Sequence, residues 1–144
     1  MIRLGIVGCN YGRAVQLPAF RADSRCRVMA LAGSDAARTA ELAHQSEIPE
    51  AYGDWRQMIA RADIDAIAIA TPPRLQPEIA IAALKSGHIR HAGLDVFHNE
   101  PLPPTHPLAK LDNVTLSAHA AFRTPEASET LLRRAIDIVK KIVG

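Results

Sequence analysis

The chain has 144 residues, of which 48% are hydrophobic and 22% charged, and its net charge is +2 at pH 7. This length suits one domain that needs no disulfide, and so weak a positive charge does not indicate nucleic-acid binding. No apolar run approaches the roughly 18 residues of a membrane span, and MIRLGIVGCN reaches glycine too early for a signal peptide. We therefore expect a soluble, cytoplasmic protein with reduced thiols at Cys9 and Cys26.

Predicted strands and helices alternate along the chain. Short β-branched or apolar runs predict strands at 2–7, 26–33, 51–55, 65–71, 92–96 and 113–118. Helix-forming stretches between and after them predict helices at 15–23, 35–46, 55–62, 76–87 and 124–143. Ser34 or Asp35 is placed to cap the second helix, and Gly87 closes the fourth.

This alternation predicts the fold class. Strands separated by helices form a parallel sheet with helices on both faces, as in α/β proteins. The right-handed crossover rule then favours a doubly wound, six-stranded Rossmann sheet with the order 3-2-1-4-5-6.

A glycine cluster follows the first predicted strand. The stretch GIVGCNYGRAV places glycines at 5, 8 and 12, just before the next helix. A dinucleotide pyrophosphate requires a tight turn without side chains, so that backbone N–H groups can approach it. The spacing departs from GxGxxG, because Asn10 holds the middle position and Gly12 comes one residue early, although asparagine tolerates the left-handed conformation. The turn is therefore typical either of a dinucleotide site or of an ordinary strand-to-helix connection.

Four stretches of the first part occur in an informative order. GCNYGRAVQLPAF, LAGSDAARTAELA, IPEAYGDWRQMI and DIDAIAIATPP, over about residues 1–83, resemble the N-terminal domain of Gfo/Idh/MocA oxidoreductases. The resemblance implies a Rossmann domain that binds NAD(P) through the glycine turn, the end of the second strand and the ATPP turn. The residues implied as contacts are Gly8, Asn10, Tyr11, Gly12, Ser34, Arg38, Thr71, Pro72 and Pro73.

The end of the second strand bears on the choice of cofactor. An acidic residue there binds the ribose 2′-hydroxyl of NAD and disfavours the 2′-phosphate of NADP. This chain has Gly33 and Ser34 followed by Arg38, and a hydroxyl with a guanidinium favours a phosphate, so NADP(H) is favoured over NAD(H). Asp35 turned inward would reverse this preference. Alternatively, Ser34 is only a helix cap and Arg38 only a solvated side chain.

A second set of motifs follows residue 83. GLDVF, NEPLP, NVTLSAH and TPEA, over about residues 84–144, resemble the D-2-hydroxyacid dehydrogenases at matching spacings. The resemblance implies that Asp95 contacts the nicotinamide, that His119 exchanges the proton with the substrate and that Glu100 supports His119. A histidine that titrates near neutrality can protonate a 2-keto acid, and a carboxylate beside it raises its pKa. Alternatively, Glu100 and His119 are retained loop residues that no longer meet.

Parts of both parent sites are missing. No EKP triad with the first family's catalytic lysine follows Gly87, and Gln76 stands where that family has a histidine. The second family's N-x-A-R-G strand, whose arginine binds the substrate carboxylate, is absent, and Ala118 replaces the proline before the histidine. We expect neither family's substrate domain. Loss of a strand would shift later elements by about 4.8 Å, more than catalytic hydrogen bonds tolerate.

We interpret the chain as a recombined or designed chimera. Residues 1–83 and 84–144 would join at the helix IAALKSG and complete one NAD(P)-binding domain over residues 1–144. Three functions fit: a dinucleotide-binding module without turnover, which we place first, a minimal NAD(P)-dependent 2-keto acid reductase using Glu100 and His119, and a fold-only protein without a ligand.

Other candidate sites and partners are weaker. No spacing puts three histidines on one helix face, so we expect no metal site among His88, His91, His98 and His106. The predicted helix 124–143 has an apolar stripe wider than one sheet face requires, which favours homodimerisation. No membrane partner is expected.

Overall fold

A computed structural model of the chain describes residues 1–87, 89, 91–94, 96–97, 99–117, 126 and 129. The elements up to residue 69 are β1 (Ile2–Val7), the π-helix η1 (Gly12–Gln16), α1 (Leu17–Ala22), β2 (Cys26–Ala32), α2 (Ala36–Gln45), β3 (Glu50–Tyr52), α3 (Trp55–Ile59) and β4 (Ala66–Ile69). After them come the 3-10 helix η2 (Pro73–Leu75), α4 (Gln76–Lys85), β5 (Ala92–Leu94), the 3-10 helix η3 (Pro107–Lys110) and β6 (Val114–Leu116).

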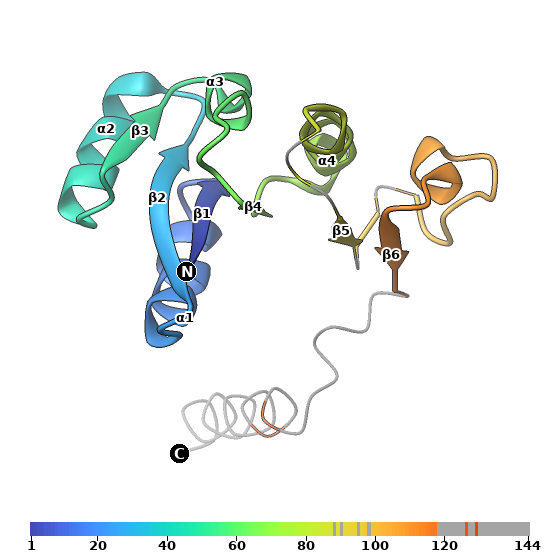
Figure 1. Ribbon diagram of the computed structural model, residues 1–144, viewed down its shortest axis with the longest axis horizontal. Coiled ribbons are helices and arrows are strands. Elements are labelled where there is room, and N and C mark those ends of the chain that lie inside the picture. Colours follow the sequence, from blue (N-terminus) through green and yellow to red (C-terminus); the bar gives the residue numbers. More distant parts are fainter. Residues whose placement is uncertain are drawn as a thin grey trace, which may run out of the picture.

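The first four strands form a parallel sheet with the order β3-β2-β1-β4 (Figure 1). Strand β1 lies inside this sheet, where its residues 2–7 pair with β2 and its residues 4–7 pair with β4. The edge strand β3 pairs with residues 30–32 of β2. The predicted order of these four strands is confirmed, and the architecture is a Rossmann-like α/β fold.

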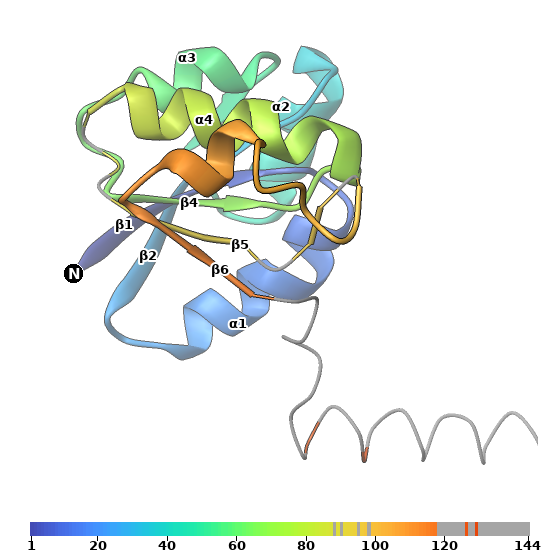
Figure 2. The ribbon, with the colours of Figure 1, turned by 90° about the vertical axis from the view of Figure 1, so that its right-hand side faces the viewer.

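Helices cover both faces of this sheet. Leu17 of α1 and Ala43 of α2 belong to a core cluster with Ile6 on one face. On the other face, Met58 of α3 and Ile79 of α4 belong to a second cluster. Figures 1 and 2 show α1 on one side of the sheet, and α3 and α4 on the other. Because both faces are buried, the strands need the near-continuous apolar sequences from which they were predicted.

Helix ends follow the local signals in the sequence. The Asp35 side chain accepts a hydrogen bond from the Arg38 backbone N–H at 2.9 Å, so Asp35 rather than Ser34 caps α2. The Asp54 side chain caps α3 in the same way, through the backbone N–H of Arg56. Gly87, with a φ of 86°, takes the left-handed conformation just after α4, as predicted.

The prediction of one six-stranded sheet is wrong for the described residues. Strands β5 and β6 pair in parallel with each other in a separate two-stranded sheet, and β5 does not pair with β4. Figure 1 shows this second sheet on the β4 side of the first, and Figure 2 shows β5 running in the same direction as β4. Ile89 is buried in the same core cluster as Ile64 and Ile79. Side-chain packing, rather than hydrogen bonding to β4, therefore holds the chain where it enters β5.

None of the described helices combines the length and the apolar character that spanning a bilayer requires. The predicted helix 124–143 falls outside the described residues, except for Glu126 and Glu129, which are helical and exposed.

Candidate cofactor site

The turn after β1 depends on Gly8. This residue has a φ of 122°, and its backbone N–H donates to the Ala32 carbonyl oxygen at 2.9 Å. A Cβ atom at this position would lie 2.4 Å from the carbonyl oxygen of Ala70, just beyond the end of β4. The turn and the end of β4 therefore touch, and only glycine allows this approach. Asn10 has no positive φ, so the left-handed step of the turn falls on Gly8 instead.

The helical segment after this turn starts earlier than predicted and in an unusual form. A π-helix begins at Gly12, and the Leu17 backbone N–H donates to the Gly12 carbonyl oxygen. A Cβ atom at Gly12 would lie 2.6 Å from Cγ2 of Ile6 and 3.3 Å from Cβ of Ala70, so glycine also permits close packing of η1 on β1 and β4. Pro18 is the second residue of α1, which continues directly from η1. Single π-helical turns often mark functional sites.

Buried polar atoms without a hydrogen-bond partner occur on η1 and on the turn after β4. They are Nε of Arg13, Oε1 of Gln16 and Oγ1 of Thr71. Gln16 is close to the contact of the turns, because its Oε1 lies 3.8 Å from the Cβ position at Gly12. Buried polar groups of folded proteins nearly always have partners, which makes this combination informative. Nε of Arg13 is a donor and Oε1 of Gln16 an acceptor, whereas Oγ1 of Thr71 can act as either.

The turn after β4 carries three of the implied contacts. Thr71 is half-buried, whereas Pro72 and Pro73 are exposed. The amide nitrogen Nε2 of Gln76 donates to the Thr71 carbonyl oxygen at 2.8 Å, so the residue at the position of the family histidine braces this turn.

The end of β2 is open to solvent. Ser34, Asp35 and Arg38 are all exposed, and so are Asn10 and Tyr11 on the first turn. Because the Asp35 carboxylate caps α2, it already has a partner within its own helix. The structure thus brings together the turns that carry Gly8, Gly12 and Thr71, with the other implied contacts on the surface around the carboxyl ends of the strands.

Arg13 and Gln16 are absent from the residues inferred from the sequence. The sequence feature that could have indicated them is that both follow the glycine turn closely: Arg13 comes directly after Gly12, and Gln16 comes four residues after it. Whether their polar atoms are buried depends on how η1 packs against β4, and no local pattern specifies that packing.

Of the candidate catalytic pair, Glu100 is described, whereas His119 falls outside the described residues. Asp95, the implied nicotinamide contact, also falls outside them, so the implied roles of Asp95 and His119 stay predictions. Glu100 is exposed, and its Oε1 accepts a hydrogen bond from the Phe97 backbone N–H at 2.9 Å.

The candidate metal residues are partly described. His88 and His98 lie outside the described residues. The His91 ring hydrogen-bonds with the Thr115 hydroxyl at 2.8 Å, and Nδ1 of His106 accepts from the Leu108 backbone N–H at 3.2 Å. No group of three metal-ligating side chains occurs in the described part of the chain.

Carboxyl groups with shifted pKa values lie away from these turns. Hydrogen bonds from Arg3 hold the pKa of Asp65, just before β4, well below its usual range. Hydrogen bonds from Arg61 and then Tyr52 likewise lower the pKa of Glu50 on β3. These ion pairs connect strand ends with loops, and they do not include any of the implied cofactor contacts.

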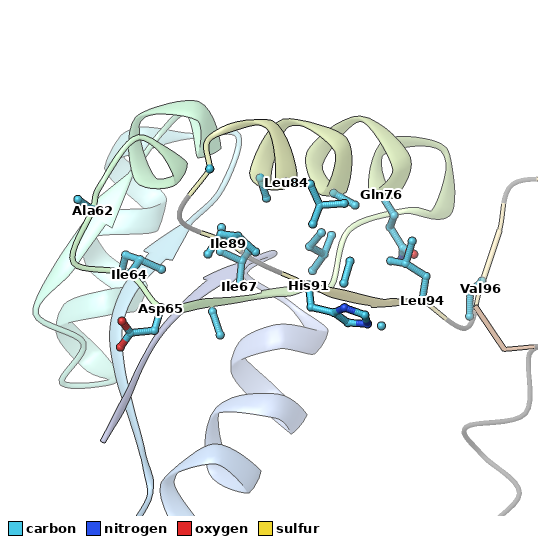
Figure 3. A pocket seen from close by; sticks show the side chains of 17 residues that line it. Ala62, Ile64, Asp65, Ile67, Gln76, Leu84, Ile89, His91, Leu94 and Val96 are labelled. Atoms are coloured by element: carbon cyan, nitrogen blue, oxygen red, sulfur yellow. The ribbon is translucent and has the colours of Figure 1, made fainter. Parts of the chain in front are cut away.

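A cavity of about 940 Å³ lies elsewhere, between β4, α4 and β5 (Figure 3). Ile67 and Ile69 of β4, Ala83 and Leu84 of α4, and Gly93 of β5 are among its lining residues. None of the implied cofactor contacts that the structure describes lines it, whereas Asp95, between the lining residues Leu94 and Val96, falls outside the described residues.

The sequence profile of the Gfo/Idh/MocA oxidoreductases, a family with an NAD-binding Rossmann fold, matches residues 2–120. The chain belongs to this family. The match covers the turns after β1, β2 and β4, and it continues beyond residue 83, where the first resemblance in the sequence ended.

Curated relatives include reductases of a second kind. A glyoxylate reductase of Thermofilum pendens is 48% identical over 69 residues, which cover 48% of this chain and 20% of that protein. A glyoxylate/hydroxypyruvate reductase B of Yersinia pestis is 38% identical over 92 residues, which cover 62% of this chain and 28% of that protein. The chain thus spans less than a third of the length of these relatives.

Solved structures with the same fold contain either cofactor. Biliverdin reductase from Synechocystis, in complex with biliverdin and NADP+, is 33% identical with a TM-score of 0.57, and the match covers 66% of this chain and 29% of that one. Levoglucosan dehydrogenase in complex with NADH is 26% identical with a TM-score of 0.51, and covers 65% and 27%. These neighbours do not determine which cofactor this chain prefers.

Proposed function

We propose that the chain is a dinucleotide-binding module that holds NAD(P) across the turns after β1, β2 and β4, without turnover of its own. The observation that carries this proposal is the set of buried, unpartnered polar atoms on Arg13, Gln16 and Thr71, next to the Gly8 turn. A bound dinucleotide offers phosphate, hydroxyl and amide groups that can satisfy such atoms. A nicotinamide cofactor would bring hydride-transfer chemistry, and the part of this chain in the proposal is to bind and orient that cofactor.

Titration of the protein with NADPH and NADH, followed by calorimetry, tests this proposal. Saturable binding of either cofactor is expected. Thr71→Val, which keeps the shape and removes the hydroxyl, should weaken binding by about three- to tenfold, as loss of one hydrogen bond does. Thr105→Val, at an exposed position between β5 and β6, is the matched control and should bind as the wild type does. A flat titration with both cofactors would support the fold-only alternative.

Within this proposal, Ser34 and Arg38 favour NADP(H). Both are exposed at the end of β2, and capping of α2 uses the carboxylate of Asp35, the residue that could oppose a 2′-phosphate. Arg38→Ala should weaken NADPH binding and leave NADH binding unchanged. Equal loss for both cofactors would contradict the preference.

A second candidate function is favoured by the relatives named glyoxylate reductase. In this alternative the chain reduces a small 2-keto acid, with Asp95 at the nicotinamide, His119 as proton donor and Glu100 as its support. For the module we expect no oxidation of NADPH with glyoxylate or hydroxypyruvate. Oxidation that is lost in His119→Ala and retained in His44→Ala would establish the reductase instead.

The two kinds of relatives also support the proposal that residues 1–83 and 84–144 come from different dehydrogenase families, joined by recombination or design. A boundary near residue 83 predicts that residues 92–117 unfold separately from the four-stranded sheet. Hydrogen exchange in increasing urea tests this, since one common transition would contradict it.

Homodimerisation through the predicted helix 124–143 is proposed from its sequence alone. Light scattering should give twice the chain mass for the wild type and the chain mass for Ile138→Glu. A monomeric wild type would contradict this proposal.

A further inference from the structure

We propose that the cavity between β4 and β5 is a binding site for an extended peptide segment, which enters as a parallel strand and joins the two sheets. The cavity separates two strands that run in the same direction, and α4 covers one side of it (Figures 2 and 3). This site is distinct from the turns assigned to the dinucleotide.

The edge of β4 that faces the cavity carries free backbone groups. The Ala70 backbone N–H donates to the Val7 carbonyl oxygen at 2.7 Å, and residues 4–7 pair in register with residues 66–69. Because the N–H and C=O groups of successive strand residues point to opposite edges, those of Ile67 and Ile69 point away from β1. Both residues line the cavity, and neither pairs with another strand among the described residues.

The facing edge of β5 has the same property. The Ala92 backbone N–H donates to the Asn113 carbonyl oxygen at 3.0 Å, and the Leu94 carbonyl oxygen accepts from the Ser117 backbone N–H at 2.9 Å. These bonds direct the backbone groups of Ala92 and Leu94 toward β6, so those of Gly93, between them, point to the cavity. Gly93 lines the cavity and is exposed.

Two strand edges with free donors and acceptors define the chemistry of the occupant. Only a polypeptide in extended conformation offers N–H and C=O groups alternately on both sides at the strand repeat. Strand β4 has four residues and β5 has three, so a segment of three or four residues matches them in length. On the α4 side, Ala80, Ala83 and Leu84 line the cavity, so alternate side chains of the segment should be apolar.

The burial of β4 supports the same conclusion. All four of its residues are half-buried, although their sequence is apolar and helices pack on the sheet. Strand β1, which has partners on both edges, is fully buried from Leu4 to Val7. An additional strand beside β4 would bury Ile67 and Ile69 further, because it would cover the exposed edge of the sheet.

The test uses the full chain and the peptide acetyl-KTVTVTK-amide, whose valines form one apolar face. We expect the peptide to slow amide hydrogen exchange of Ile67, Ile69 and Gly93 by about tenfold at saturation, since each amide gains a strand hydrogen bond. Exchange at Ala92 and Ser117, whose amides already pair within the β5–β6 sheet, should not change. The same peptide N-methylated at both valines keeps its side chains but loses hydrogen bonds along one edge, and it should not protect these amides.

Variants of Gly93 provide a matched pair. Gly93→Pro removes the N–H that faces the cavity and leaves the bonds to β6, so peptide affinity should fall by about tenfold, the equivalent of one hydrogen bond. Gly93→Ala keeps that N–H, and its Cβ meets no atom within 4 Å, so affinity should stay within about twofold. Exchange at Ala92 and Ser117 reports whether each variant keeps the β5–β6 pairing.

Three outcomes would overturn the proposal: no protection by the peptide, equal protection by the N-methylated peptide, or equal affinity in Gly93→Pro and Gly93→Ala. Protection of the same amides by NADPH alone would also overturn it, by assigning the cavity to the dinucleotide. Failure of NADPH to bind anywhere would affect only the proposed function, because no cofactor contact in the described part of the chain lines the peptide site.

Discussion

The four-stranded sheet with its helices (residues 1–87, the first region) and the β5–β6 pair with its connection (residues 92–117, the second region) have similar strand patterns in the sequence. Among the described residues, only the sheet of the first region is enclosed by packed side chains. Ile6, Leu31 and Met58 of the first region are fully buried between sheet and helices. From Ala92 onward, Leu108 is the one hydrophobic residue that is buried among those the structure describes. Leu116 of β6 is 39% exposed. Parallel strands with short pairings are stable where helices cover both faces, and the second region lacks that cover in its described part.

The largest expected difference between the regions is the cost of removing a leucine side chain. Leu31→Ala should destabilise the protein by about 3 kcal/mol, because it leaves a cavity in a packed core. The same change at Leu116 should cost less than about 1 kcal/mol. Urea denaturation of both variants measures the difference, and similar costs would show that the second region is as well packed as the first.

Glycine positions give a second contrast. Gly8→Ala should destabilise the protein by about 2 kcal/mol or more, because it combines a φ of 122° with a contact of 2.4 Å to the Ala70 oxygen. It should also abolish cofactor binding. Gly93→Ala should change stability by less than about 0.5 kcal/mol, since its Cβ enters open space. Thermal unfolding of the two variants tests this, and an unaffected Gly8→Ala would mean that the turn can shift away from β4.

Helix capping in the first region should have a smaller effect. Asp35→Ala removes the acceptor for the Arg38 backbone N–H and should cost about 1 kcal/mol. Asp35→Asn retains a capping oxygen and should cost less. Urea denaturation midpoints of Asp35→Ala and Asp35→Asn measure this difference. A higher midpoint for Asp35→Ala than for Asp35→Asn would contradict the capping role of Asp35.

The smallest expected effect concerns the ion pair between Arg3 and Asp65, which joins β1 to the start of β4 at 2.8 Å. Because Arg3 lowers the pKa of Asp65, the ionised carboxylate favours the folded state. That contribution is complete above the ordinary value of 3.8 and is lost as the pH falls toward the lowered pKa. Asp65→Asn should therefore be less stable than the wild type at pH 5, with a smaller difference near pH 2.

Urea midpoints at the two pH values measure this narrowing. Asp112→Asn, an exposed carboxylate of the second region, is the control and should show no such narrowing. A constant difference between wild type and Asp65→Asn at both pH values would contradict the role of the ion pair.

Much of the candidate site was predictable because its signals are local. Gly8 and Gly12 mark the turn, and Thr71 follows an apolar strand directly in the sequence. The buried polar atoms of Arg13 and Gln16 were not predictable, since their environment depends on contact between η1 and the end of β4. The choice between Ser34 and Asp35 as the cap also required the structure, because both residues suit that position.

Up to the end of α4, the sequence by itself determined the approximate positions of the strands and helices, the order of the first four strands and the turn at Gly8. Apolar periodicity, caps and glycine act over a few residues and need no knowledge of distant contacts. Only the tertiary structure decided that β5 pairs with β6 and leaves a cavity beside β4. Strand pairing across a sheet is non-local, and here Ile89, just before β5, packs in the core while β5 pairs with β6 and not with β4.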